Sequence, residues 1–339
     1  MSISIIIPTT DNRNNIVLRT LEYYKHSSFE IIVVDSSKTK NKYLENIQGN
    51  VKYLHLPKKN FSQKMEFGIN IAKHEFVNFC QDDDFVLIES LNLGLEFLKK
   101  NIDYSAVHGN YIFFEKIYNK IFYELGYSQN TRKSFSSAKF SKRLDELTTI
   151  APQSVSVLTY KKILLQNFIF LKNFKKIALF ELAILFFISS NGKLKYIDTP
   201  WQIRDIKIHD KLILNFIRRH KSSFEEISDF KIFLKSKIGI KFSADLFNKV
   251  TQFNNIDITS FTNSLNSYTK NQVIKKNKFE EYKVYLIKFF PTFFIFLKKF
   301  NFLLRYILKC LSYKKNQNFL PRKNLLINIE QLIFKFKKI

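Results

Sequence analysis

Apolar runs and amphipathic segments alternate along the N-terminal part of the chain. Runs of β-branched and aromatic residues bounded by polar residues are typical of buried strands. The sequence predicts such strands over residues 3–7, 30–34, 51–56 and 76–80. Apolar residues at helical spacing predict helices over residues 12–25, 61–73 and 87–99. Strands that alternate with helices indicate an α/β fold, with a mainly parallel sheet flanked by helices.

The pattern becomes more varied after this alternation. Two further strands, consistent with a hairpin, are expected over residues 103–114 and 116–123, and a last short strand over 192–198. Between them, residues 177–188 are apolar at every position except Glu181. This segment is too short to span a bilayer, so we expect a buried helix.

Polar residues follow several of the predicted strands where each strand ends. The first strand runs into Pro8, Thr9, Thr10 and Asp11, and the second ends at Asp35. Because the carboxyl ends of parallel strands meet at one edge, where α/β sheets bind ligands, we expect these side chains to lie together. Asp35 suits the hydroxyl or base N–H donors of a nucleoside.

Asp82, Asp83 and Asp84 follow the strand at residues 76–80 and belong to the same edge. Consecutive carboxylates beside a buried strand need a positive partner. Mg²⁺ or Mn²⁺ is the natural candidate, because these ions use one or two protein carboxylates together with water and phosphate oxygens. The alternative is that the aspartates end the strand and cap the next helix. Lys64, near the start of a helix, could reach a phosphate or pair with the acidic residues; a solvated lysine is the alternative.

Composition adds information about partners and compartment. The 339 residues carry a net charge of +26, which favours phosphates, nucleic acid or an anionic membrane surface as partners. Richness in Lys, Asn, Ile and Phe is expected of an A+T-rich genome, so codon bias explains part of this charge. The two cysteines, Cys80 and Cys310, lie far apart, which indicates a reducing cytoplasmic setting. Met1 leads directly into a strand without a basic leader, so we expect no signal peptide.

Ordered motifs make the first part of the chain resemble family 2 glycosyltransferases. The resemblance is close over residues 1–125 and looser to about residue 210. It implies a GT-A (Rossmann-like) fold, a nucleotide-diphosphate sugar donor, a divalent metal at the DxD motif, and inversion at the anomeric carbon. The motifs that carry it are residues 4–9, 31–37, 68–76 and 81–85.

Two positions depart from the family pattern. Gln81 stands where the family often has an aspartate, so the metal pair could be Asp82 with Asp84 or Asp83 with Asp84. Asp84 belongs to both pairs, and Asp82 with Asp84 is the pair we adopt. His74 replaces a usual glycine, a change that we expect to alter only a turn.

Glu181 is the candidate general base. A carboxylate in apolar surroundings should have a raised pKa, which suits removal of a proton from an acceptor hydroxyl. The resembled enzymes place their base near the start of a downstream helix, often as Glu-Asp or Asp-Glu, so Glu181-Leu182 is a partial match. The alternative is a glutamate that reaches the surface.

Three other residues are candidates with strong structural alternatives. The resemblance suggests that Arg204 could hold the diphosphate and that His209 could approach the metal; a surface arginine and a solvated histidine are the alternatives. His108 could face the donor, although a structural histidine is the favoured interpretation. Residues 128–149 are polar and predict either an acceptor lid or a simple mobile loop.

The composition changes after residue 210, which divides the chain into a predicted GT-A domain (1–210) and a basic, aromatic-rich helical extension (211–339). Residues 283–311 combine many Phe and Leu with Lys and Arg. An amphipathic helix on an anionic membrane has this composition, and so does a helical subdomain that buries its own Phe side chains.

The sequence therefore predicts a metal-dependent, hexosyltransferase-like enzyme that acts on a glycan or lipid-linked acceptor. Surface polysaccharide or lipopolysaccharide synthesis, at the inner face of the cytoplasmic membrane, is the expected setting. A sugar nucleotidyltransferase is an alternative, but the loop after the first strand lacks the Gly-rich phosphate-binding pattern. A non-catalytic sugar-nucleotide-binding scaffold at the membrane is another. No nucleic-acid-binding signature accompanies the charge.

Overall fold

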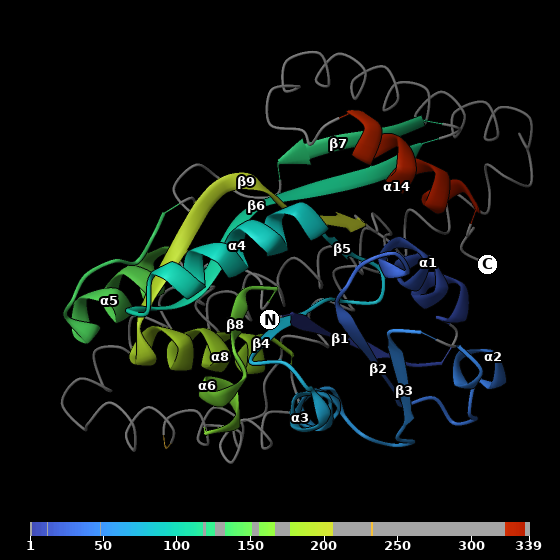
Figure 1. Ribbon diagram of the computed structural model, residues 1–339, viewed down its shortest axis with the longest axis horizontal. Helices are drawn as coiled ribbons and strands as arrows, with labels where there is room; N and C mark the ends of the chain where they lie inside the picture. Colours follow the sequence, from blue (N-terminus) through green and yellow to red (C-terminus); the bar gives the residue numbers. More distant parts are fainter. Residues whose placement is uncertain are drawn as a thin grey trace, which may run out of the picture.

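The computed structural model describes residues 2–11, 13–47, 49–117, 120–125, 133–150, 156–166, 177–205, 232 and 323–335. These residues build a single mixed sheet with helices on both faces (Figure 1). The α/β class expected from the sequence is confirmed. The strands are β1 (Ile3–Thr9), β2 (Glu30–Asp35), β3 (Val51–His55), β4 (Phe76–Phe79), β5 (Phe85–Val86), β6 (Tyr104–Ile117), β7 (Lys120–Leu125), β8 (Leu158–Tyr160) and β9 (Lys193–Asp205).

The sheet has the order β3-β2-β1-β4-β8-β6-β9-β5, with β7 paired to β6. Strands β1 to β4 are mutually parallel, and β6 runs parallel to β9. Strand β8 is antiparallel to both β4 and β6, so it joins the two parallel sets. The carboxyl ends of β1, β2 and β4 therefore lie at one edge, as the alternation of elements predicted.

Helices cover the two faces of this sheet in two groups. One face packs against α1 (Asn14–Tyr24), α4 (Ile88–Lys100) and the short α2 (Lys42–Glu45), through side chains such as Leu21, Leu44 and Leu91. The other face packs against α3 (Phe61–Ile71), α5 (Phe140–Ile150), α6 (Lys161–Leu165) and α8 (Ile177–Asn191). Alternate residues of β1 and β2 enter each core, because successive strand side chains point to opposite faces.

The start of α3 has a local explanation in the sequence. The Asn60 side chain accepts a hydrogen bond from the Gln63 N–H at 2.9 Å, and the Gln63 side chain accepts one from the Asn60 N–H at 3.1 Å. This capping box satisfies backbone donors that a helix leaves unpaired at its first turn. It fixes the beginning of the helix that carries Lys64.

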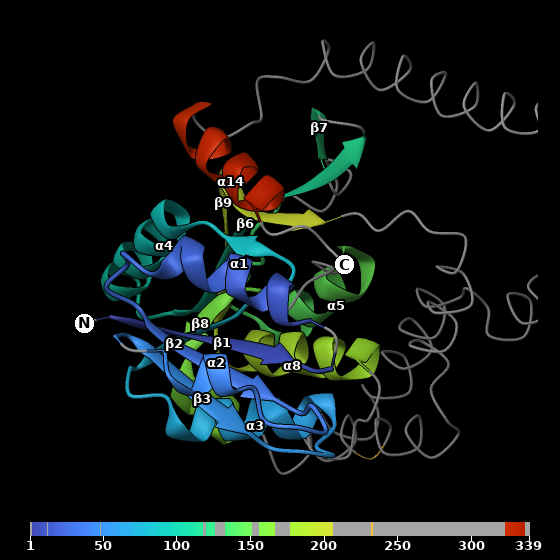
Figure 2. The same cartoon turned by 90° about the vertical axis from the view of Figure 1, so that its right-hand side faces the viewer.

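The last described helix, α14 (Lys323–Lys335), comes from the basic extension and packs on the first part of the chain. Leu326, Ile329 and Ile333 form a third core with residues of β5, β6, β7 and β9, including Phe85 and Ile203. Figure 2 shows α14 beside β6, β7 and β9, above α1. No helix in the described ranges is long and apolar enough to cross a membrane.

Several sequence-based boundaries need correction. Residues 140–149 of the polar stretch 128–149 belong to the helix α5 and not to a loop. Phe140, Leu144 and Leu147 are spaced i, i+4, i+7, and Leu144 and Leu147 are fully buried. The strand expected at 192–198 continues to Asp205 as β9, because it pairs with β6 along its length.

Candidate functional site

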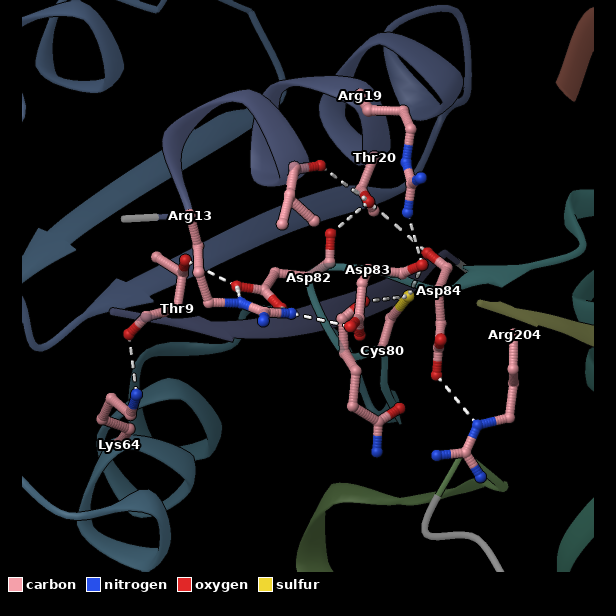
Figure 3. A network of polar contacts seen from close by, with 12 residues as sticks. Thr9, Arg13, Arg19, Thr20, Lys64, Cys80, Asp82, Asp83, Asp84 and Arg204 are labelled. Atoms are coloured by element: carbon pink, nitrogen blue, oxygen red, sulfur yellow. Dashed lines mark hydrogen bonds and ion pairs between the residues drawn. The ribbon is translucent and has the colours of Figure 1, made fainter. Parts of the chain in front are cut away.

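The predicted edge brings the polar residues of β1, β2 and β4 together. Thr9 and Asp35 are register partners at the ends of β1 and β2. The Cys80 N–H, just after β4, donates to the Ile6 carbonyl at 3.0 Å, which fixes the start of the loop that carries the aspartates. Figure 3 shows this loop facing Thr9 and Lys64 on one side and Arg204 on the other.

Asp82 is held through its carboxylate, by Arg13 and Thr9, and through its backbone carbonyl, by Thr20. Its carboxylate accepts hydrogen bonds from Thr9 Oγ1 at 2.7 Å and Arg13 Nε at 2.6 Å, and a second Arg13 nitrogen contacts its other oxygen. Thr20 Oγ1 donates to the Asp82 carbonyl at 2.7 Å. The residue is only 4% exposed. A charge-assisted, two-point contact of this kind is among the stronger polar contacts in proteins.

Asp83 and Asp84 contact different arginines. Arg13 Nη2 lies 2.8 Å from Asp83 Oδ2, so one guanidinium bridges Asp82 and Asp83. Asp84 Oδ2 accepts a hydrogen bond from Gln202 Nε2 at 2.7 Å and lies 3.2 Å from Arg204 Nε (Figure 3). Each carboxylate of the triplet therefore faces a guanidinium.

Arg13 is the site residue that sequence reasoning missed. Burial alone would lower its pKa, but the hydrogen bonds and charges of Asp82 and Asp83 raise that pKa above its ordinary value. One signal was available: Arg13 is the only Lys or Arg among residues 1–18, and it follows directly on the polar loop after β1. Its contact with residues 82 and 83 depends on the fold and not on spacing along the chain.

Asp35 is buried at the second strand end, as expected. Its Oδ1 accepts hydrogen bonds from the Ser37 N–H at 2.8 Å and from the Ser37 hydroxyl, and its Oδ2 accepts one from the Tyr53 hydroxyl at 2.7 Å. Burial and the Asp35 charge keep the pKa of Tyr53 raised. Each carboxylate oxygen has two lone pairs, so these bonds orient Asp35 without exhausting its acceptor capacity.

The other predicted donor-binding residues differ in exposure. Pro8 is buried, whereas Thr10 and Asp11 are exposed, and Asp11 Oδ1 accepts a hydrogen bond from the Lys38 N–H at 3.0 Å. Lys64 is buried and donates to the Thr9 carbonyl at 2.7 Å. Burial lowers the Lys64 pKa, and the charges of Asp82 and Asp35 offset part of that change. Lys64 thus lies among the acidic groups and is not a solvated surface lysine.

Glu181 lies in the first turns of α8, among buried residues such as Phe180, Ala183 and Ile184, and is itself partly exposed. Loss of hydration raises the pKa of Glu181 to about 7, and the charge of Arg204 opposes this rise in part. The direction of this shift is the one that the apolar surroundings predicted. Arg204 acts on both Glu181 and Asp84, so it connects the candidate base to the acidic triplet.

The chemistry of the triplet fits a divalent cation only with help from a substrate. Carboxylate oxygens are the hard ligands that Mg²⁺ and Mn²⁺ prefer. Within the described ranges, however, no group of three His, Cys, Asp or Glu side chains is arranged to hold a metal ion. Phosphate oxygens and water would have to complete the coordination of a metal at Asp84.

His108 lies inside β6 and is almost fully buried. Burial lowers its pKa to about 4, so the ring is neutral at physiological pH. Its ring packs against those of Tyr111 and Tyr196, with centroids 6.5 and 5.5 Å away. These contacts favour the structural interpretation. His209, Cys310 and residues 283–311 lie outside the described residues, so the predictions about them stay predictions.

Comparisons with known proteins give a matching family model and structures of similar fold. Residues 4–158 match the family model described as Glycosyl transferase family 2. No curated protein sequence matches the chain.

Crystal structures of S. aureus TarS have the same fold. The structure of TarS 1-349 has a TM-score of 0.52 and 16% identity, and the match covers 76% of this chain and 72% of that one. The same fragment in complex with UDP-GlcNAc gives a TM-score of 0.53 and 14% identity over 76% and 73%. In complex with UDP it gives 0.50 and 15% over 76% and 72%. Residues 4–158 of this chain therefore resemble family 2 glycosyltransferases in sequence, and the chain shares the GT-A fold of these structures.

Proposed function

We propose that the protein transfers a sugar from a nucleotide-diphosphate donor to a hydroxyl of a glycan or lipid-linked acceptor, with inversion at the anomeric carbon. The reaction would serve surface polysaccharide or lipopolysaccharide synthesis. The observation that carries the proposal is the position of Arg204, which contacts Asp84 on one side and acts on the partly buried Glu181 on the other. One guanidinium thus interacts electrostatically with both the acidic triplet and the candidate base.

The donor would lie along the edge formed by Pro8, Thr9, Asp35 and the triplet. Asp35 is oriented by Ser37 and Tyr53 and is suited to accept hydrogen bonds from a nucleoside. Thr10 and Asp11 form the exposed part of the same loop, and Lys64 and Arg204 supply positive charge for the diphosphate. The likeness to TarS, which was crystallised with UDP and UDP-GlcNAc, supports a nucleotide sugar as donor and makes UDP the first nucleotide to test.

Asp84, with Asp82 or Asp83, would hold Mn²⁺ or Mg²⁺ together with the diphosphate oxygens. A bound divalent ion would neutralise the negative charge that develops on the departing diphosphate. Arg204 is in a position to share this role, because its guanidinium is next to Asp84.

Glu181 would act as the general base. The acceptor oxygen would form a bond to the anomeric carbon while the hydroxyl proton passes to the Glu181 carboxylate. The bond between the anomeric carbon and the diphosphate oxygen would break, and its electron pair would leave with the nucleotide diphosphate. A base with a pKa of about 7 is available in its ionised form at neutral pH and still accepts a proton readily.

The extension after residue 210 would hold the enzyme near lipid-linked acceptors at the cytoplasmic face of the membrane. The support is compositional, since the Phe-rich, basic residues 283–311 suit an anionic interface. The full-length protein should sediment with anionic liposomes at low salt and less so at high salt. If the protein does not sediment with the liposomes at low salt, the membrane proposal fails and these aromatic residues belong to a protein core.

A ligand screen tests the donor proposal. UDP-, GDP-, CDP- and dTDP-sugars are added with and without Mn²⁺ while the thermal midpoint is measured, because a ligand that binds the native state raises it. The proposal expects one nucleotide class to stabilise the protein in a Mn²⁺-dependent way and then to be turned over with acceptor. Binding without any turnover would favour the scaffold alternative, and no binding would reject the donor site.

A further inference from the structure

The acidic triplet is already engaged by cationic side chains. Arg13 contacts both carboxylate oxygens of Asp82 and also the carboxylate of Asp83. Arg204 lies beside Asp84. Asp82 and Asp84 are almost fully buried, so little water screens these contacts. A divalent cation that approached Asp82 or Asp83 would have to displace the guanidinium of Arg13.

Arg13 differs from its neighbour Arg19 in what surrounds its side chain. Arg19 is 3% exposed and stacks over the rings of Phe85 and Phe114, at 5.0 and 5.8 Å from their centroids. The Arg13 side chain is 22% exposed and ends in contacts with carboxylates. Its backbone is fixed, because the Arg13 carbonyl accepts hydrogen bonds from the Ile16 and Val17 N–H groups. The side chain of Arg13 can therefore turn without loss of core packing.

We infer that Arg13 is an internal counter-ion that couples metal binding to donor binding. In the free protein it occupies Asp82 and Asp83 and keeps a metal from binding there. A nucleotide diphosphate adds negative charge at this edge and offers a guanidinium a bidentate partner, so Arg13 moves from the carboxylates to the phosphates. The cation then enters with the diphosphate. This inference rests on the proposed donor site and specifies the order in which that site fills.

The experiment measures Mn²⁺ binding by titration calorimetry, with UDP as the nucleotide probe. Wild-type protein should bind Mn²⁺ at least ten-fold more weakly alone than with saturating UDP, within the usual range of coupling between two ligands. Arg13→Gln should bind Mn²⁺ alone at least ten-fold more tightly than wild type and should bind UDP more weakly. In this variant, the Mn²⁺ affinities measured with and without UDP should differ less than in wild type.

Two further variants separate charge from geometry. Arg13→Lys keeps the charge but loses the two-point contact, so its Mn²⁺ affinity should lie between those of wild type and Arg13→Gln. Lys25→Gln removes the same charge from an exposed position, where Lys25 pairs with Glu22, and should behave as wild type. If Arg13→Gln does not fold, the wild-type and Arg13→Lys titrations still decide the question.

Equal Mn²⁺ affinity of wild-type protein with and without the nucleoside diphosphate that binds it, UDP being the first tested, would overturn the inference. Equal affinity of wild type and Arg13→Gln for Mn²⁺ alone would also overturn it. Absence of binding by UDP, GDP, CDP and dTDP would instead reject the proposed donor site. In that case the titrations with Mn²⁺ alone still show whether Arg13 excludes the metal.

Discussion

The two halves of the sheet handle ionisable groups in opposite ways. At the edge of β1, β2 and β4, carboxylates are buried against guanidinium and hydroxyl groups, as in the contacts of Asp82 with Arg13 and Thr9. Around β6, β9 and α8, Glu181 and His108 lie in apolar surroundings, and burial shifts both of their pKa values toward the neutral form. The first half keeps charged groups paired, whereas the second favours the neutral form of its ionisable groups, and of these two only Glu181 has a pKa near neutral pH.

The strand geometry of the two halves differs as well. β1, β2 and β3 pair in an uninterrupted parallel register. β6 and β9 pair with register shifts between Tyr104 and Ala106, and on both sides of Asn110. Regular parallel strands place their carboxyl ends at one edge, whereas the shifts displace side chains along β6 and β9.

The largest expected effect concerns Glu181, in the half around β6, β9 and α8. Glu181→Gln should lower turnover by about 100-fold or more, the scale of losing a general base, while donor affinity stays unchanged. In wild type, kcat/KM should rise with pH up to about 7 and then level off, because Glu181 must be ionised to accept the proton. Steady-state kinetics across pH, with calorimetry for donor binding, measures both. Near-normal turnover would exclude Glu181 as the base.

The matching change at the edge of β1, β2 and β4 is Asp84→Asn. The substitution is nearly isosteric and removes the charge that faces Arg204. We expect Mn²⁺-dependent donor affinity to fall by about 30- to 100-fold, the scale of truncating one member of a buried charged pair. Asp103→Asn is the control, because Asp103 is an exposed carboxylate that also pairs with a cation, Lys193. Unchanged donor affinity in Asp84→Asn would exclude Asp84 from the metal site.

A smaller effect is expected at Gly109, where the backbone of β9 lies close to that of β6. A Cβ at Gly109 would lie 2.7 Å from the Thr199 carbonyl oxygen and 2.9 Å from that of Ile197, so the backbones must separate. Gly109→Ala should cost about 2 kcal/mol in free energy of unfolding. In the regular half, a Cβ at Gly68 would meet the Ile6 side chain at 2.5 Å, and a side chain can move more easily than a backbone. Gly68→Ala should therefore cost less, and denaturant unfolding of both variants tests the difference.

The smallest effect is the contribution of His108 to the pH dependence of stability. Its pKa of about 4 in the folded state lies below the unfolded value of 6.5, so its contribution is present above pH 6.5 and is lost as pH falls toward 4. Between pH 7 and 5.5 wild type should lose about 1 kcal/mol relative to His108→Gln. Urea unfolding at both pH values measures this difference. A difference that does not change with pH would mean that His108 is hydrated or charged in the folded protein.

The features that the sequence predicted correctly are those set by local pattern. Short apolar runs and the polar residues after them predicted the buried strands, their order along the chain and the aspartates at their ends. The sequence therefore located β1 to β4 and the polar edge. The raised pKa of Glu181 followed from its apolar neighbours in the same helix. These properties depend on residues close together in the chain.

The features that were missed depend on contacts between distant segments. Arg13 meets Asp82 and Asp83 only after β1 and β4 pair, and Gln202 meets Asp84 only because β5 pairs with β9. The three-residue strand β8 is too short to show a periodicity, and it is defined by its pairing with β4 and β6. The helix α5 was hidden because its apolar positions stand among polar residues.

The position of α14 has a consequence for the order of folding during synthesis. Phe85, next to Asp84, belongs to a core that α14 completes with Leu326, Ile329 and Ile333. The ribosome makes the 117 residues between β9 and α14 after the strands that α14 covers. At about 5–20 residues per second this interval is on the order of 10 s. During that time the apolar residues behind the acidic loop lack part of their cover, so the nascent chain is a ready target for a chaperone until α14 emerges.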